Sequence, residues 1–212
     1  MKEVSRINLG LVEAPAIDAR TVLEALAGGL LPDWPGIADA IQTVDLARGE
    51  RLFRTGEVHP YVYVVTRGLV KMLYETADGA VWLKGFATPG LCFASIAALA
   101  PGGRSSFAVE ALAGATLARI PYAAIEPLAA RHLAWQRMTA RAFEIYGRRK
   151  EKRERELLTL SAEARYLGFL DEYQEFIALI PQKDIASYIR VTPVALSRIK
   201  ARLRAPKHVV SD

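Results

Sequence analysis

The stretch IPQKDIASYIRVTPVALSRIKARL, residues 180–203, decides the architecture of the C-terminal part of the chain. It reads as two short helices joined by a tight turn. The second helix begins at Thr192, where a hydroxyl N-cap is followed by a proline at the first helical position. Apolar residues on both sides of the turn predict one buried seam, made of Ile185, Ala186, Ile189, Val191, Leu196 and Ile199. This spacing is typical of a helix-turn-helix, and a plain packing hairpin is the alternative.

The net charge of the chain is concentrated in the same region. The 212 residues carry 28 Lys and Arg against 23 Asp and Glu, a formal charge of +5. Residues 1–146 sum to zero, whereas residues 181–207 hold one acid, Asp184, and seven basic residues: Lys183, Arg190, Arg198, Lys200, Arg202, Arg204 and Lys207. A basic segment of this kind indicates a polyanionic partner such as double-stranded DNA, although a solvated helix face is the simpler interpretation.

The geometry of a helix-turn-helix assigns roles to individual side chains. The helix expected over residues 193–203 would lie in the major groove with its first turn against the base edges. Arg198 can present a guanidinium fork to guanine, worth about 1–3 kcal/mol of discrimination, while Pro193 and Val194 offer only apolar contacts. The other expected contacts are with phosphates: Gln182, Lys183, Thr192, Ser197, Lys200, Arg202 and Arg204. Binding through such contacts should weaken steeply with salt.

Residues 42–120 show a different pattern, in which short apolar runs alternate with turn residues. Runs such as YVYVVT and LVKMLYE are rich in Val, Tyr and Thr and recur about every ten residues. Asp78-Gly79, between two of these runs, is a strong hairpin signal. The pattern predicts an antiparallel β-sandwich or barrel.

Helical periodicity flanks these strands. We expect short helices over residues 18–30, with Val22, Leu23, Leu26 and Leu30 on one face, and over residues 122–130, opened by Pro121. A long helix is expected over residues 132–160, and a further one from Ser161, with Tyr166, Leu167 and Leu170 on one face. The long helix exceeds what one small domain can cover. It therefore suggests a two-fold homodimer, or else a solvated, charge-laced helix.

Composition excludes several classes of protein. Cys92 is the single cysteine, so neither a disulfide framework nor an iron–sulfur cluster can form within one chain. The three histidines, His59, His132 and His208, are scattered, so no metal or haem site is expected. The sequence contains no run of about 18 apolar residues, so no membrane helix is predicted. Acidic residues interrupt the N-terminal stretch, where a signal peptide would need an apolar core. We therefore expect a cytoplasmic protein with no membrane contact.

With these motifs in place, residues 40–203 resemble the Crp–Fnr family of bacterial transcription regulators. In the strand region the similarity rests on LFRTGE (52–57), YVVTRGLVKM (63–72), Asp78-Gly79, Pro89-Gly90 and Arg104-Ser105. In the C-terminal part it rests on SAEARYLGFL (161–170) and on the stretch at 180–203. The resemblance implies an α+β fold in three parts: an antiparallel, jelly-roll-like β-roll sensor domain at residues 1–131, a dimerisation helix at 132–160, and a helix-turn-helix domain at 161–212.

Departures from the family pattern concern the effector. Members that bind cyclic nucleotides carry a Gly-Glu pair that contacts the ligand, and here Ala94 and Ser95 stand in its place. A lost carboxylate would leave a ribose hydroxyl unpaired, at about 1–3 kcal/mol, so cAMP is not the expected effector. Arg104 and Ser105, with Ser95, remain as candidate ligands for another small anion, and a surface-loop arginine is the alternative for Arg104.

Two further departures concern DNA. Arg190 occupies the turn position where the family usually has glycine, at a cost of about 1 kcal/mol if its backbone is left-handed. Val194 stands where the family's reader often carries a Glu, which implies a different target sequence.

The sequence thus predicts a homodimeric DNA-binding transcription regulator, not an enzyme, with a near-palindromic operator and RNA polymerase as a further partner. Its β-roll would sense an unknown effector or none, without a certain cofactor. One alternative is a β-roll that binds a ligand or a protein beside a vestigial DNA motif. Another is an enzyme on a cupin-like β-roll, which would need a His and Glu metal cluster.

Overall fold

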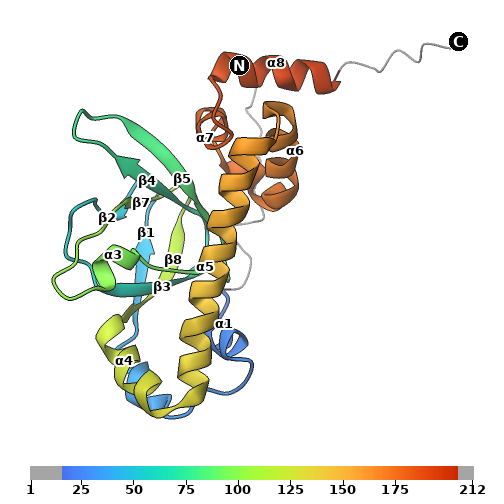
Figure 1. Cartoon of the computed structure of the whole chain (residues 1–212). Coiled ribbons are helices and arrows are strands. Elements are labelled where there is room, and N and C mark those ends of the chain that lie inside the picture. The colour runs from blue at the N-terminus through green and yellow to red at the C-terminus, as the bar shows by residue number, and fades with distance from the viewer. Residues whose placement is uncertain (1–15, 205–212) are drawn as a thin grey trace, which may run out of the picture.

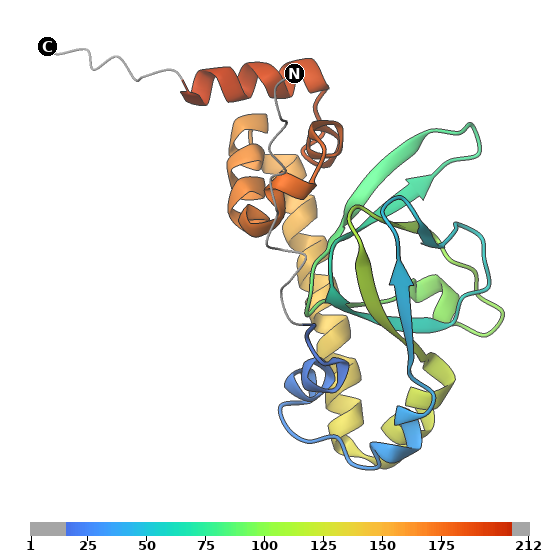
Figure 2. The same cartoon turned by 180° about the vertical axis from the view of Figure 1, so that it is seen from behind.

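A computed structural model describes residues 16–204 of the chain. A β-roll packs along one side of a single long helix, α5, and the C-terminal helices gather at one end of that helix (Figures 1 and 2). Helices α1 and α4 lie at its opposite end. This arrangement confirms the α+β class and the β-roll expected from the sequence. None of the helices in the described part of the chain is long and apolar enough to cross a membrane.

The β-roll consists of two four-stranded sheets in which every neighbouring pair is antiparallel. One sheet has the order β1-β8-β3-β6, with β1 Gln42–Leu46, β8 Ala115–Pro121, β3 Tyr61–Arg67 and β6 Cys92–Phe93. The other has the order β2-β7-β4-β5, with β2 Arg51–Phe53, β7 Ala108–Ala111, β4 Val70–Glu75 and β5 Val81–Ala87. The predicted turn at Asp78-Gly79 joins β4 to β5, where Glu75 pairs with Val81.

The inner faces of the two sheets form an apolar core around stacked aromatic rings. The ring of Phe53 lies 6.0 Å from that of Tyr63 and 5.6 Å from that of Phe107. At the edge of this core Gly68 has φ +83, and a Cβ placed there would lie 2.2 Å from the carbonyl oxygen of Gly114. Only glycine therefore allows the turn between β3 and β4 to approach the neighbouring loop so closely.

A second core joins the N-terminal helices to α5. Its helices are α1 Ala19–Ala27, α2 Pro35–Ala38, α4 Tyr122–Arg131 and α5 Leu133–Thr159. Trp135 of α5 is fully buried there and its indole NH donates to the carbonyl of Pro32 at 2.8 Å. The expectation for residues 18–30 was correct for Val22 and Leu23, which are buried. It was wrong for Leu30, which is 77% exposed because α1 ends before it at Gly28, where φ is +72.

The C-terminal helices follow α5 without an extended linker. They are α6 Ala162–Glu172, the 3-10 helix η2 Gln174–Leu179, α7 Gln182–Tyr188 and α8 Pro193–Arg204. A helix begins at Ser161 as predicted, and the Ser161 hydroxyl caps it by accepting the amide of Ala164 at 3.1 Å. The expected buried face of α6 was wrong in one position: Leu167 is 48% exposed, and Phe169 is buried in its place.

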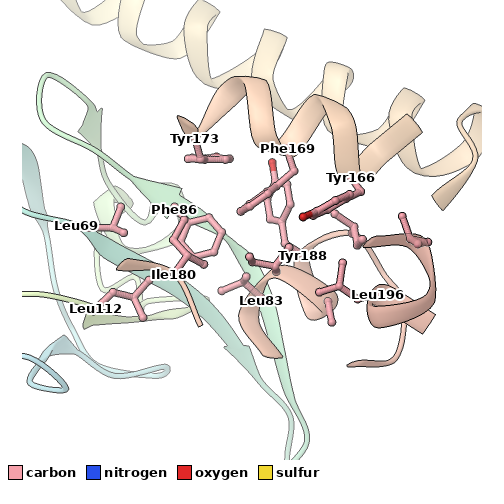
Figure 3. Packing of buried hydrophobic residues seen from close by; sticks show 14 of the residues in the cluster. Leu69, Leu83, Phe86, Leu112, Tyr166, Phe169, Tyr173, Ile180, Tyr188 and Leu196 are labelled. Carbon is pink, nitrogen blue, oxygen red and sulfur yellow. The ribbon is translucent and has the colours of Figure 1, made fainter. Parts of the chain in front are cut away.

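A third core crosses the boundary between the β-roll and the C-terminal helices (Figure 3). We call it the interdomain cluster. The β-roll supplies Leu69, Leu73, Leu83, Phe86 and Leu112, and the C-terminal helices supply Tyr166, Phe169, Tyr173, Ile180, Ile185, Ala186, Tyr188, Ile189, Leu196 and Ile199. The predicted seam of the two short helices is therefore one side of a larger core that also includes strand residues.

Candidate nucleic-acid interface and ligand cavity

The two short helices at residues 180–203 are present as expected. The Thr192 hydroxyl accepts the amide of Ala195 at 3.2 Å and caps α8. In the turn, Val191 donates to the carbonyl of Ala186 at 3.0 Å, and Arg190 has φ 60. The left-handed residue lets the chain reverse between α7 and α8, so Arg190 adopts a conformation that glycine would take without strain.

Helix α8 presents one free face. Leu196 and Ile199 are buried in the interdomain cluster, whereas Val194 is 62% exposed and Ser197 and Arg198 are exposed. Helix α8 crosses the end of α5 at the outer end of the molecule, away from the β-roll (Figure 1). The residues expected to reach base edges thus share an open helical surface.

The residues expected to contact phosphate divide into two groups. Within residues 16–204, Lys183 makes no ion pair, and neither does Arg198, the residue expected to contact a base. Lys200 instead donates to the side-chain carbonyl of Gln182 at 2.8 Å. Arg202 lies 3.0 Å from the carboxylate of Glu163 on α6. Gln182 and Lys200, from different helices, therefore lie together, while Arg202 is shared with a carboxylate that repels phosphate.

Helix α7 is docked on strand β5 of the β-roll. The centre of the Phe86 ring on β5 lies 5.6 Å from that of Tyr188 on α7. It also lies 6.0 Å from that of Phe169 on α6 and 5.3 Å from that of Tyr173, both edge-on. At the rim of these rings the amide of Leu83 donates to the Ser187 hydroxyl at 3.4 Å. The helix-turn-helix is thereby held to the β-roll through α7, and the outer face of α8 stays exposed.

Charged side chains surround this contact. The ammonium of Lys71 on β4 lies 3.6 Å from the buried carboxylate of Asp184 on α7 and 3.0 Å from that of Glu110. From the other side, Arg153 of α5 stacks over the Tyr188 ring at 3.9 Å and donates to the backbone carbonyl of Tyr188. These contacts tie α7 to both the β-roll and the long helix.

The candidate effector residues Ser95, Arg104 and Ser105 are used within the fold. Arg104 donates to the backbone carbonyl of Gly56 at 2.9 Å. The buried Ser105 hydroxyl donates to the carbonyl of Phe107 at 2.6 Å, and the buried Ser95 hydroxyl accepts the amide of Ser106 at 3.1 Å. These three residues lie outside the lining of the large cavity described next.

A cavity of about 600 Å³ opens between the β-roll and α5. Its walls are mainly apolar and come from β4, β5, the segment around Cys92 and the inner side of α5. They include Met72, Lys84, Phe86, Cys92, Ile96, Met138, Phe143, Tyr146, Arg149, Lys150 and Tyr188. Because Phe86 and Tyr188 also belong to the interdomain cluster, the cavity borders the helix-turn-helix.

Lys84 is the residue of this cavity that the sequence analysis missed. Its ammonium lies 4.8 Å from the centre of the Phe107 ring and 5.7 Å from that of Tyr146 on α5. Burial and the nearby cations Lys150 and Arg149 lower the pKa of Lys84 to about 8. The available signal was a lysine inside the apolar strand WLKGFA, residues 82–87. In the same wall, burial raises the pKa of the Cys92 thiol to about 12.

The sequence and the fold resemble those of known proteins. Residues 43–132 match the family model of the cyclic nucleotide-binding domain. FixK2 from Bradyrhizobium japonicum is similar with a TM-score of 0.65 and 22% identity, over 77% of this chain and 84% of that one. The c-di-GMP-responsive global regulator CLP of Xanthomonas campestris gives 0.63 and 15%, over 88% and 92%.

A transcriptional regulator of the CRP family from Thermus thermophilus is also similar, with a TM-score of 0.61 and 23% identity, over 76% of this chain and 84% of that one. No curated protein matches the sequence. At these identities the likenesses establish a shared fold. They extend beyond the domain at residues 43–132 to most of the chain.

Proposed function

We propose that this chain is a Crp–Fnr regulator, a homodimeric, sequence-specific DNA-binding transcription regulator; the proposal is supported by a cyclic nucleotide-binding domain joined to a helix-turn-helix in the fold of such regulators. The observation that carries the proposal is the free face of α8. That face presents Arg198 beside Ser197 and Val194, while the buried face holds α8 on the rest of the protein. A helix held in this way can enter a major groove without unfolding its own core.

The proposed base contact is a guanidinium fork from Arg198 to guanine. Pro193 and Val194 would meet apolar base edges, and Thr192 and Ser197 the adjacent phosphates. Lys183 and the Gln182–Lys200 pair would lie along the backbone. Arg202 must weaken or break its ion pair with Glu163 to reach a phosphate. It should therefore contribute less to DNA affinity than Lys183.

Dimerisation is proposed for α5. The helix has 27 residues and carries the exposed apolar side chains Leu133, Phe143, Tyr146 and Leu158. Pairing of two such helices about a two-fold axis would cover them, and it would set two copies of α8 about one DNA turn apart, roughly 34 Å. A near-palindromic operator follows from that symmetry.

The remaining parts of the proposal concern organisation and partners. Residues 1–131 serve as sensor, 132–160 as dimerisation helix and 161–212 as DNA-binding domain; Lys207 and His208 lie outside the described residues. We infer action on chromosomal DNA in the cytoplasm, with RNA polymerase as the partner at a promoter. Cyclic AMP is not the proposed effector because Ala94 and Ser95 replace the ligand-binding pair.

The test begins with selection of bound duplexes from a random DNA library. The affinity of the selected duplex is then measured by fluorescence anisotropy over a range of salt concentrations. Three cations per chain, Lys183, Lys200 and Arg202, give six in a dimer and a log–log slope of about −5. Arg198→Ala should weaken binding by about 1–3 kcal/mol, whereas the control Arg54→Ala, on the exposed surface of the β-roll, should bind normally. A slope near zero would instead favour the β-roll interaction module with a vestigial DNA motif.

A further inference from the structure

Lys84 places a positive charge in the cavity between the β-roll and α5 without a counterion. No carboxylate of residues 16–204 lies within ion-pair distance of its ammonium. Two aromatic faces orient it, Phe107 from the β-roll and Tyr146 from α5, and the sulfur of Met72 lies 4.0 Å away. Aromatic rings attract a cation but do not neutralise it, so the charge remains available to an anion.

The charges nearest to Lys84 have the same sign. Lys150 and Arg149 line the same cavity from α5 and disfavour its protonated form. Arg149 is only loosely engaged, with 4.0 Å to the carboxylate of Glu172, which Lys152 approaches at 2.6 Å. Lys84, Arg149 and Lys150 thus line one hollow, whose rim also carries Lys152, Arg153 and Arg190 and the carboxylates of Glu154, Glu156 and Glu172. Glu156 and Glu172 are engaged by Lys152, at 3.6 and 2.6 Å. Among the described residues none of these carboxylates reaches the Lys84 ammonium, so a buried positive charge is left there that an anionic ligand would stabilise.

We propose that this cavity binds a small organic anion with an aromatic or branched apolar body, whose anionic group pairs with Lys84. The proposal rests on the proposed function, because it assigns the ligand class of that regulator's sensor domain. The cavity of about 600 Å³ has the size of an ordinary ligand site, and its apolar walls, Met138 and Phe143 among them, suit a hydrophobic body.

The same geometry argues against a sugar phosphate as the occupant. Arg104 donates to the Gly56 carbonyl, and neither Ser95 nor Ser105 lines the cavity. The polar groups that would meet a ribose are therefore engaged elsewhere. A carboxylate, sulfonate or phenolate attached to an apolar ring needs one strong cationic partner and little else, which is what Lys84 offers.

The cavity also connects the ligand to the DNA-reading unit. Its wall includes Tyr188 of α7, which packs on Phe86 with ring centres 5.6 Å apart, and Arg190 of the turn. An anion held by Lys84 would draw β5 and α5 together beside this contact. The bound state would differ from the empty one at the α7–β5 contact, which positions α8.

The test uses 8-anilinonaphthalene-1-sulfonate as the anionic probe and N-phenyl-1-naphthylamine, with the same rings but no sulfonate, as the neutral one. Both are titrated by fluorescence into the full-length native dimer. We expect one sulfonate probe per chain, at least tenfold weaker binding to Lys84→Met, and retained binding to Lys84→Arg. The neutral probe should bind wild type and Lys84→Met within about twofold. Arg104→Met, which removes the exposed arginine outside the cavity, should change neither.

Three outcomes overturn the proposal. The first is sulfonate binding that ignores Lys84→Met, and the second is sulfonate binding that depends on Arg104. The third is failure of both probes to bind the dimer. Thermal unfolding of each variant shows whether it is folded, and Lys84→Arg decides the matter if Lys84→Met is not. The DNA assay contains no probe and this assay contains no DNA, so either proposal can fail alone.

Discussion

The guanidinium of Arg190 lies 4.8 Å from the centre of the Trp82 ring, although Arg190 belongs to the turn between α7 and α8 and Trp82 to strand β5. The same residue has φ 60, a conformation that costs a side chain with a Cβ about 1 kcal/mol. Its cation–π contact, worth about 0.5–1 kcal/mol at such an exposed site, offsets much of that cost. The turn between α7 and α8 is therefore held to the β-roll at Arg190, the residue with the left-handed backbone.

Two substitutions at Arg190 separate these effects. Arg190→Ala and Arg190→Gly both remove the guanidinium, but only glycine relaxes the left-handed backbone. We expect the glycine variant to be more stable than the alanine variant by about 1 kcal/mol in urea unfolding. Equal free energies of unfolding would mean that the turn carries no strain at this residue.

Thr192 should stabilise α8 through its cap. Thr192→Ala leaves the Ala195 amide without its side-chain acceptor and should lower the free energy of unfolding by about 1 kcal/mol. Thr192→Ser keeps the hydroxyl and serves as the matched control. Circular dichroism with urea titration measures both, and a serine variant as weak as the alanine variant would contradict the capping role.

Phe86 should hold the β-roll and the C-terminal helices together. It is 1% exposed and contacts Phe169, Tyr173 and Tyr188, so Phe86→Ala should cost about 3 kcal/mol and expose the C-terminal helices to limited proteolysis. Val81→Ala, on the exposed end of the same strand, should change stability by less than about 0.5 kcal/mol. A proteolysis rate unaffected by Phe86→Ala would mean that the contact does not restrain these helices.

Substitution of Arg198 and of Lys183 should weaken DNA binding in different ways. Arg198→Ala should weaken the selected operator by about 1–3 kcal/mol and relax the preference at one base pair. Lys183→Ala should weaken all duplexes alike and reduce the salt slope by about 1 for each phosphate that the lysine no longer neutralises. Competition anisotropy with base-substituted duplexes measures both. Equal losses on cognate and random DNA for Arg198→Ala would remove it from base recognition.

Cys92 should be unreactive in the native protein. Burial disfavours the thiolate and raises the pKa of the Cys92 thiol to about 12, so the thiol stays protonated at pH 8. Ellman's reagent at pH 8 should therefore react slowly with native protein and at once after denaturation in guanidinium. Fast native reaction would show that the cavity wall opens at this point.

Much of the architecture was readable from local pattern. The Thr192 cap, the alternating strands and the long helix are properties of neighbouring residues, so their expected positions agree with the structure. The outcome for Leu167 differs because helical periodicity shows that a buried face exists but not which neighbour covers it. That neighbour is Phe86, more than 80 positions away in the chain, and only folding brings it to Phe169.

The candidate site was less predictable for the same reason. The motif Arg104-Ser105 is visible in the sequence, but the bond from Arg104 to the Gly56 carbonyl depends on how two distant loops meet. Lys84 belongs to no motif, and its importance comes from facing Tyr146 across the gap between β5 and α5. Charge counted along the chain located the expected DNA-binding segment, yet it could not show which cations are already paired.

The interdomain cluster has a consequence for how such proteins diversify. The helix-turn-helix completes its hydrophobic core with Leu83 and Phe86, which belong to the β-roll. Exchange of the C-terminal helices for those of a relative would pair an unfamiliar surface with strand β5, so recombination at the end of α5 would yield a poorly packed hybrid. A hybrid that folds well would need to take β5 and the C-terminal helices from the same parent. The segment that must be exchanged together is therefore larger than the helix-turn-helix.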